Sequence, residues 1–150
     1  MDLAQEFYDL FRGSDIAHGT FEINSERVAD GKRQGTARVI REATTIDHWR
    51  SHLDGKTGLG IIPITSENTV RWCAIDVDVY SLDHNALARK LKALHIKGVL
   101  CRSKSGGGHL YFFLSEAIPA GDAMSKCGAI ASLLGYGNCE IFPKQATILL

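Results

Sequence analysis

Apolar residues recur at the spacing of an amphipathic helix in four stretches of the chain. In the third stretch, Leu87, Leu91 and Leu94 fall on one side of a helix, and Asp83 is positioned to cap its first turn. The predicted helices cover residues 2–12, 46–54, 83–95 and 121–134.

Shorter apolar stretches, bounded by glycine, proline or polar residues, predict strands. They cover residues 37–41, 59–64, 71–79, 98–102, 109–114 and 139–142. Residues 13–34 are rich in charged and turn-forming residues, so they predict a loop with a short strand.

The elements after residue 69 follow one another in the order β-α-β-β-α-β. This order is typical of the ferredoxin-like or RRM-like arrangement of α+β proteins. We therefore predict an RRM-like module over residues 69–150, preceded by an N-terminal α/β module over residues 1–68. In this topology the first and third strands are central, and the fourth strand lies beside the first.

Acidic residues interrupt two of these apolar strands. Asp76 and Asp78 alternate with apolar residues in the first strand, so the strand period of two predicts both carboxylates on one face. Glu140 falls on the fourth strand, which pairs with the first. Three carboxylates there would suit Mg²⁺ or Mn²⁺, which prefer oxygen ligands. The alternatives are a solvated strand end for the aspartates and an edge-strand charge that deters aggregation for Glu140.

A polar segment rich in glycine connects the second and third strands. Consecutive glycines let backbone N–H groups approach an anion, and hydroxyl, cationic and imidazole groups add further phosphate partners. The alternative is a flexible hairpin turn, and the G-x-x-x-x-G-K-[ST] pattern of a Walker A loop is absent. The candidate phosphate-binding residues are Arg102, Ser103, Lys104, Ser105, Gly106, Gly107, Gly108 and His109.

These two features converge on one face of the predicted sheet. Carboxylates on the first and fourth strands would hold metal ions, while the glycine-rich segment enters the third strand beside them. Metal ions next to a triphosphate site are the layout of a nucleotidyltransferase.

Composition limits the protein class. The chain has 150 residues, of which 45% are apolar, and this predicts one compact domain with a real core. No apolar run approaches the roughly 20 residues of a membrane helix, and the N-terminus does not resemble a signal peptide. None of the four cysteines forms a C-x-x-C pair, so we expect reduced thiols in a cytoplasmic protein.

The balanced charge hides an asymmetry between the two halves. With 17 basic and 17 acidic side chains the net charge is zero, which argues against a strongly basic nucleic-acid coat. Residues 1–70 carry 8 basic and 11 acidic side chains, whereas residues 71–150 carry 9 and 6. Three of those six acids are the candidate metal ligands. Attraction of a polyanion is therefore expected to be local and to depend on metal.

Together the three motifs resemble those of the archaeo-eukaryotic primase superfamily, which read hDhD, S-x-S-G-G-x-H and hE. Here they stand as AIDVDVY (residues 74–80), SKSGGGHLYFF (residues 103–113) and CEIFPKQ (residues 139–145). They are most similar to the primase-polymerases of TOTE conflict systems and of related phage or mobile elements. Supporting similarity comes from AHG (residues 17–19), GK (residues 31–32) and HWRSHLDGKTGLGIIPI (residues 48–64). The resemblance thus implies one primase-polymerase domain over residues 1–150.

This resemblance implies a DNA primase or DNA polymerase that adds nucleotides to a 3′-hydroxyl by two-metal catalysis. Asp76, Asp78 and Glu140 would hold two divalent ions, Mg²⁺ or Mn²⁺. Residues 103–109 would bind the triphosphate of an NTP or dNTP, with His109 on a phosphate. Weaker candidates for phosphate or template contact are Arg102, Lys104 and Lys144.

The partners implied by the resemblance are single-stranded or primed DNA and, in a longer parent protein, a helicase or other domains. The setting implied is the cytoplasm of a bacterial or phage-infected cell. Relatives usually continue with a segment around the pattern G-N-W-I-N-L-P-Y, which this chain lacks. We therefore expect a C-terminally truncated catalytic module, in which activity is affected more than fold or nucleotide binding.

Two alternative functions stay open at this point. The first is an inactive module on the same fold that binds nucleotides or single-stranded nucleic acid. The second is a metal-dependent nuclease, although Glu140 lacks the E-x-K spacing that such enzymes often show.

Overall fold

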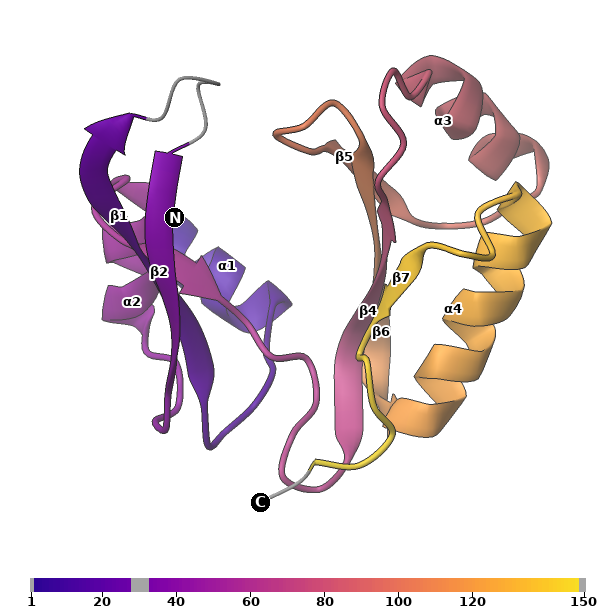
Figure 1. The fold of residues 1–150 in the computed structure, drawn as a ribbon. Helices are drawn as coiled ribbons and strands as arrows, with labels where there is room; N and C mark the ends of the chain where they lie inside the picture. Colours follow the sequence, from indigo (N-terminus) through magenta and orange to yellow (C-terminus); the bar gives the residue numbers. More distant parts are fainter. Residues whose placement is uncertain (1, 28–32, 149–150) are drawn as a thin grey trace. The chain divides into compact units, whose positions relative to one another are not determined.

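The computed structural model of the protein describes residues 2–27 and 33–148, and the chain divides into two compact units (Figure 1). The first unit comprises Met1–Ser66 and the second Glu67–Leu150. None of the described helices is long and apolar enough to cross a membrane.

The first unit combines a three-stranded sheet with two helices. Its strands lie in the order β2-β1-β3, and both neighbouring pairs are antiparallel. In chain order its elements are α1 (Leu3–Leu10), β1 (His18–Arg27), β2 (Arg33–Ile40), α2 (Ile46–Leu53) and β3 (Gly58–Gly60).

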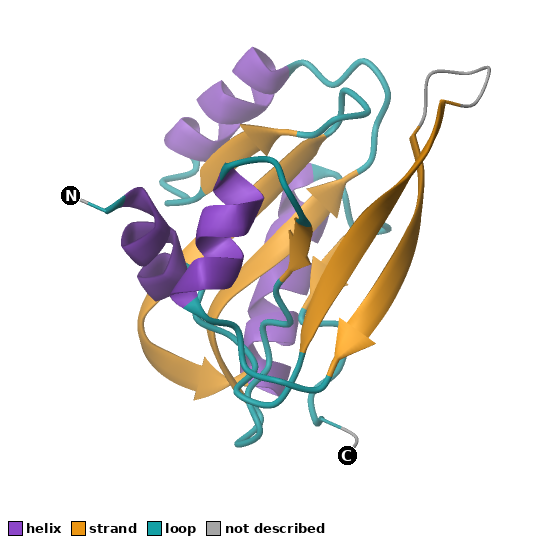
Figure 2. Ribbon diagram, turned by 90° about the vertical axis from the view of Figure 1, so that its left-hand side faces the viewer, coloured by secondary structure: helices purple, strands orange, loops and turns teal. Residues whose placement is uncertain are grey.

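The strands of this unit differ most from the prediction. Residues 13–34 were expected to be mainly loop, but β1 alone spans ten residues and pairs with β2 from His18↔Ile40 to Arg27↔Arg33 (Figure 2). Backbone pairing with a partner strand makes this hairpin, and the polar composition of the segment conceals it. The strand expected over residues 59–64 ends at Gly60, because the Ile62 carbonyl accepts a hydrogen bond from Ser14 N–H at 2.7 Å instead.

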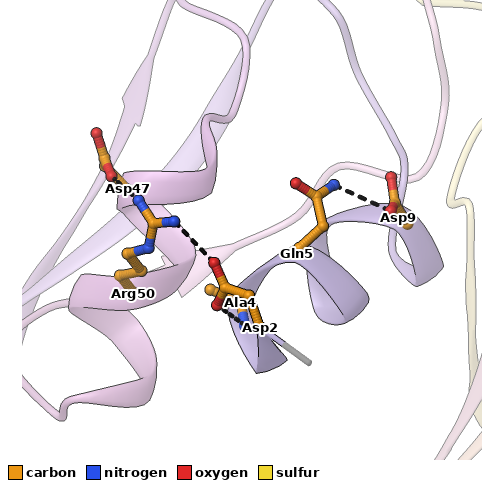
Figure 3. A network of polar contacts seen from close by, with 6 residues as sticks. All are labelled: Asp2, Ala4, Gln5, Asp9, Asp47 and Arg50. Atoms are coloured by element: carbon orange, nitrogen blue, oxygen red, sulfur yellow. Dashed lines mark hydrogen bonds and ion pairs between the residues drawn. The ribbon is translucent and has the colours of Figure 1, made fainter.

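The two helices of this unit are joined by aromatic packing and by an arginine. The ring of buried Trp49 on α2 lies 5.4 Å from that of Phe7 on α1, between centroids. Arg50 donates to Asp2 and Asp47, each at 2.7 Å (Figure 3). Asp2 also caps α1 through Ala4 N–H. The hydrogen bond from Arg50 lowers the pKa of Asp2.

In the second unit the elements follow the predicted β-α-β-β-α-β order. The sheet order is β5-β6-β4-β7 with every neighbouring pair antiparallel, so the first and third strands are central and the fourth lies beside the first, as predicted. The elements are β4 (Thr69–Val77), α3 (His84–Ala93), β5 (Val99–Arg102), β6 (Gly108–Pro119), α4 (Ala120–Leu134) and β7 (Glu140–Phe142).

Both helices of the second unit lie on the same face of its sheet (Figure 1). α4 contacts β4, β6 and β7, while α3 contacts β5. On β4, Cys73, Ile75 and Val77 belong to the core, and Cys73 meets Cys127 of α4. Because side chains alternate along a strand, Asp76 belongs to the opposite face.

Candidate active site

A row of three polar side chains crosses the sheet of the second unit on the face opposite the helices. Asp76 of β4 pairs in register with His109 of β6 on one side and with Glu140 of β7 on the other. Directly paired residues of antiparallel strands present their side chains on the same face. His109 Nε2 lies 3.4 Å from Asp76 Oδ1. The fourth strand lies beside the first, as predicted, and this pairing puts Glu140 next to Asp76.

Asp78 lies just after the end of β4 and not, as predicted, within the strand. The strand period was expected to place it beside Asp76, but β4 ends at Val77, so the alternation does not extend to Asp78. The chain turns there, and Asp78 N–H donates to the Asp76 carbonyl at 3.1 Å. Its side chain is exposed.

Both aspartates affect the pKa of the Cys139 thiol. Burial raises its pKa, a hydrogen bond from the Asp78 backbone lowers it, and the charges of Asp76 and Asp78 raise it further. Both carboxylates therefore affect the thiol of the residue that directly precedes Glu140.

Glu140 and Lys144 form an ion pair at the edge of this row. Lys144 Nζ donates to Glu140 Oε1 at 2.9 Å and lies 5.0 Å from the centroid of the Phe142 ring. Both charged side chains are more than half exposed, at 56% for Lys144 and 61% for Glu140. The ammonium group is therefore held at one of the candidate metal ligands.

Residues 103–108, here called the glycine loop, form a tight turn between β5 and β6. Gly106 N–H donates to the Ser103 carbonyl at 3.2 Å, and Ser103 N–H donates to the Gly107 carbonyl at 2.9 Å. The hydroxyl groups of Ser103 and Ser105 lie 3.2 Å apart. Gly106 has a φ of +93°, a conformation that residues with a Cβ rarely adopt.

The glycine loop is packed against the end of β4. A Cβ on Gly107 would collide with the Val77 carbonyl oxygen and would lie 3.4 Å from the Asp78 Cα. Gly108 pairs in register with Arg102, whose side chain is exposed, as is that of Lys104. The loop and the acidic residues are thus neighbours, with two cationic side chains exposed on the loop side.

Two residues of this site were not anticipated. His84, the first residue of α3, contacts the Gly107 carbonyl through Nε2 at 2.8 Å. Tyr111 Oη lies 3.5 Å from His109 Nδ1, and burial raises the pKa of this phenol, with smaller contributions from Cys101 and Asp76. Tyr111 could have been found from its position two residues after His109, but no spacing rule links His84 to the loop.

The donor chemistry of the acidic residues fits a hard divalent ion, while their arrangement is open. Within residues 2–27 and 33–148, no three His, Cys, Asp or Glu side chains are grouped as a metal site. Asp76 is turned to His109 and Glu140 to Lys144. Carboxylate oxygens are nevertheless the ligands that Mg²⁺ and Mn²⁺ prefer, and Asp76 pairs in register with Glu140.

The N-terminal motifs lie in the first unit. His18 of the AHG motif is buried, and its Nδ1 donates to the Glu42 carbonyl at 2.8 Å, while its ring lies 4.5 Å from that of His48 between centroids. The GK motif at residues 31–32 lies outside the described residues.

Comparison with known proteins places the chain in a family. The family model of the Archaeo-Eukaryotic Primase domain of TOTE conflict systems matches residues 23–147, which include every candidate site residue. A comparison with curated proteins found no match. Since the matched region covers most of the chain and both units, the chain belongs to the Archaeo-Eukaryotic Primase domain family of TOTE conflict systems.

Proposed function

We propose that this chain is a template-dependent nucleotidyltransferase, a DNA primase or primase-polymerase that adds nucleotides to a 3′-hydroxyl. The observation that carries the proposal is the row Asp76, His109 and Glu140, with the glycine loop packed beside it against Asp78. In this proposal residues 69–150 serve as an RRM-like catalytic palm, and residues 1–68 help to hold the template or primer.

The primase superfamily generally uses divalent metal ions, and Asp76, Asp78 and Glu140 are the residues that would hold them. When bound, two such ions would activate the attacking 3′-hydroxyl and neutralise the leaving pyrophosphate. Glu140 forms an ion pair with Lys144, so metal binding to its carboxylate would break the contact with the Lys144 ammonium group. Breaking that contact costs little, because an exposed ion pair contributes at most about 1 kcal/mol.

The glycine loop would receive the triphosphate of the NTP or dNTP. The hydroxyls of Ser103 and Ser105 lie together on the turn and would bind phosphate oxygens. Arg102 and Lys104 would supply positive charge, and His109 would donate to a phosphate from beside Asp76. Lys144, once released from Glu140, would be available for phosphate or template contact.

The nucleic-acid partner is single-stranded or primed DNA. Asp76 and Asp78 carry negative charge at the proposed site. Without metal ions, these carboxylates would repel an approaching phosphate backbone. Metal ions on the carboxylates would reverse the sign of the local charge. Attraction of template and nucleotide should therefore require the ions.

A primer-extension assay tests this function. The wild-type protein is incubated with primed and unprimed single-stranded DNA, labelled nucleotides and Mn²⁺ or Mg²⁺, next to a double variant carrying Asp76→Asn and Asp78→Asn. The matched control is Glu116→Gln, which removes an exposed acidic charge elsewhere on β6.

We expect extension by the wild type and by Glu116→Gln, and a loss of at least about 10³-fold in the double variant, because its metal ligands are neutralised. Extension that persists in the double variant would contradict the assignment of these aspartates. Metal-dependent nucleotide binding without extension would indicate the binding module, and shortening of the DNA would indicate a nuclease.

A further inference from the structure

The Gly107 carbonyl accepts two hydrogen bonds. One comes from Ser103 N–H at 2.9 Å, within the glycine loop, and the other from His84 Nε2 at 2.8 Å. A carbonyl oxygen can only accept, so Nε2 of His84 carries the proton. The second bond joins residues 23 positions apart and ties the loop to the first turn of α3.

The position of His84 is itself well defined. It is the first residue of α3 and is half-buried, and the preceding Asp83 caps the helix by accepting from Ala86 N–H at 2.8 Å. The imidazole is therefore presented from a fixed helix terminus.

The buried peptide between Gly107 and Gly108 joins the glycine loop to β6, where Gly108 pairs with Val77 and Arg102. Neither glycine has a Cβ, so the orientation of this peptide depends on its packing and on the two hydrogen bonds of the Gly107 carbonyl. Its carbonyl oxygen would repel a phosphate if it turned toward one. In a trans peptide the N–H points away from the carbonyl, so a carbonyl held toward α3 directs the Gly108 N–H away from α3.

We propose that His84 is a positioning residue that holds the Gly107–Gly108 peptide in one orientation and thereby fixes the glycine loop in the shape that receives a triphosphate. This inference rests on the proposed function of the loop. His84 acts through the loop backbone and is not assigned a contact with nucleotide or metal.

Two amide substitutions separate this role from a general structural one. The Gln side chain places its amide nitrogen four bonds from Cα, as His places Nε2, so His84→Gln can restore the bond to the Gly107 carbonyl. The Asn side chain is one bond shorter, so His84→Asn keeps a polar group but does not reach. His84→Ala removes the donor altogether.

The first readout is independent of nucleotide. Lys104 is exposed in the glycine loop, so trypsin cleavage after Lys104 in the folded protein reports on the loop, and cleavage after exposed Lys56 in the first unit is the internal reference. We expect cleavage after Lys104 to be about fivefold faster in His84→Ala and His84→Asn, as for loss of one hydrogen bond, and near wild type in His84→Gln. Equal cleavage in all four proteins would overturn the proposal.

The second readout is the affinity for a nucleoside triphosphate in the presence of Mn²⁺. We expect His84→Ala and His84→Asn to bind about fivefold more weakly than wild type and His84→Gln to bind normally. If cleavage follows this pattern while affinity does not, the loop is anchored by His84 but its role in triphosphate binding is refuted. If the wild type binds no triphosphate, the proposed function fails, and the cleavage pattern still decides whether His84 holds the loop.

Discussion

Gly106 and Gly107 are needed for different physical reasons, although they are neighbours in one loop. Gly106 has a positive φ and open space where a Cβ would lie, whereas a Cβ on Gly107 would meet the Val77 carbonyl. The sequence indicates only that three glycines are consecutive. The distinction depends on the strand end against which the loop packs, and β4 is distant in the sequence.

We therefore predict that Gly107→Ala lowers the free energy of unfolding by about 1–3 kcal/mol, because overpacking against backbone forces the loop to move. Urea denaturation measures the change. The control is Gly121→Ala on α4, where a Cβ would make an ordinary 3.5 Å contact with Ala146 and alanine favours the helix. Equal stability of Gly107→Ala and wild type would show that the loop does not pack as described.

The four cysteines divide by their surroundings. Cys73 and Cys127 are buried with their sulfur atoms 2.9 Å apart, and the contact with Cys73, together with burial, raises the pKa of the Cys127 thiol. Cys101 is exposed. Because a reagent must reach the sulfur atom, exposure favours reaction at Cys101, whereas burial protects Cys73 and Cys127.

A disulfide reagent that releases a coloured thiol should accordingly modify Cys101 first in the folded protein. Cys73 and Cys127 should react only after denaturant is added, and Cys101→Ser should abolish the fast phase. Peptide mass spectrometry assigns each phase to its residue. Modification of Cys127 as fast as that of Cys101 in the native state would be inconsistent with the buried pair.

At the scale of elements, the sequence predicts the second unit better than the first. In the second unit each strand is apolar enough to show its period, and the topology follows from element order. In the first unit, β1 and β2 are recognisable mainly by their mutual pairing, which no local pattern encodes. The candidate site is also only partly predictable from the sequence. The order of the strands predicts that Asp76 has neighbours on both adjacent strands. The turn at Asp78 and the hydrogen bond from His84 to the glycine loop are visible only in the structure.

One polar contact joins two connecting segments of the first unit. Asp15, which precedes β1, accepts from Ser66 N–H at 2.8 Å and from Ser66 Oγ at 2.6 Å. These bonds lower the pKa of Asp15 below its ordinary 3.8. A lowered folded-state pKa stabilises the fold above the unfolded value, and this contribution is lost as the pH falls through the folded pKa.

Asp15→Asn should therefore lower the free energy of unfolding at neutral pH by less than about 1 kcal/mol, since the carboxylate is largely exposed. The difference between variant and wild type should shrink below pH about 4, where the unfolded-state carboxylate is protonated. Denaturation curves across this pH range provide the measurement. A difference that stays constant with pH would exclude a contribution from the ionised carboxylate.

At the scale of the whole molecule, the two units differ in charge. Glu67–Leu150 carries nine basic and seven acidic side chains, and Met1–Ser66 carries eight and ten. The excess of positive charge in the second unit is small, and three of its acids are the proposed metal ligands Asp76, Asp78 and Glu140. A polyanionic substrate is therefore expected to respond to the ions held there more than to the net charge of the chain.

The most direct test of this account is the equilibrium affinity of the protein for a nucleoside triphosphate, measured with Mn²⁺ and again after chelation by excess EDTA. We predict that affinity falls at least about tenfold on chelation, since the carboxylates then repel the phosphates. In Asp76→Asn, affinity should depend much less on metal, while Glu116→Gln should behave as wild type. Equal affinity with and without metal in the wild-type protein would contradict a metal-dependent nucleotide site at Asp76, Asp78 and Glu140.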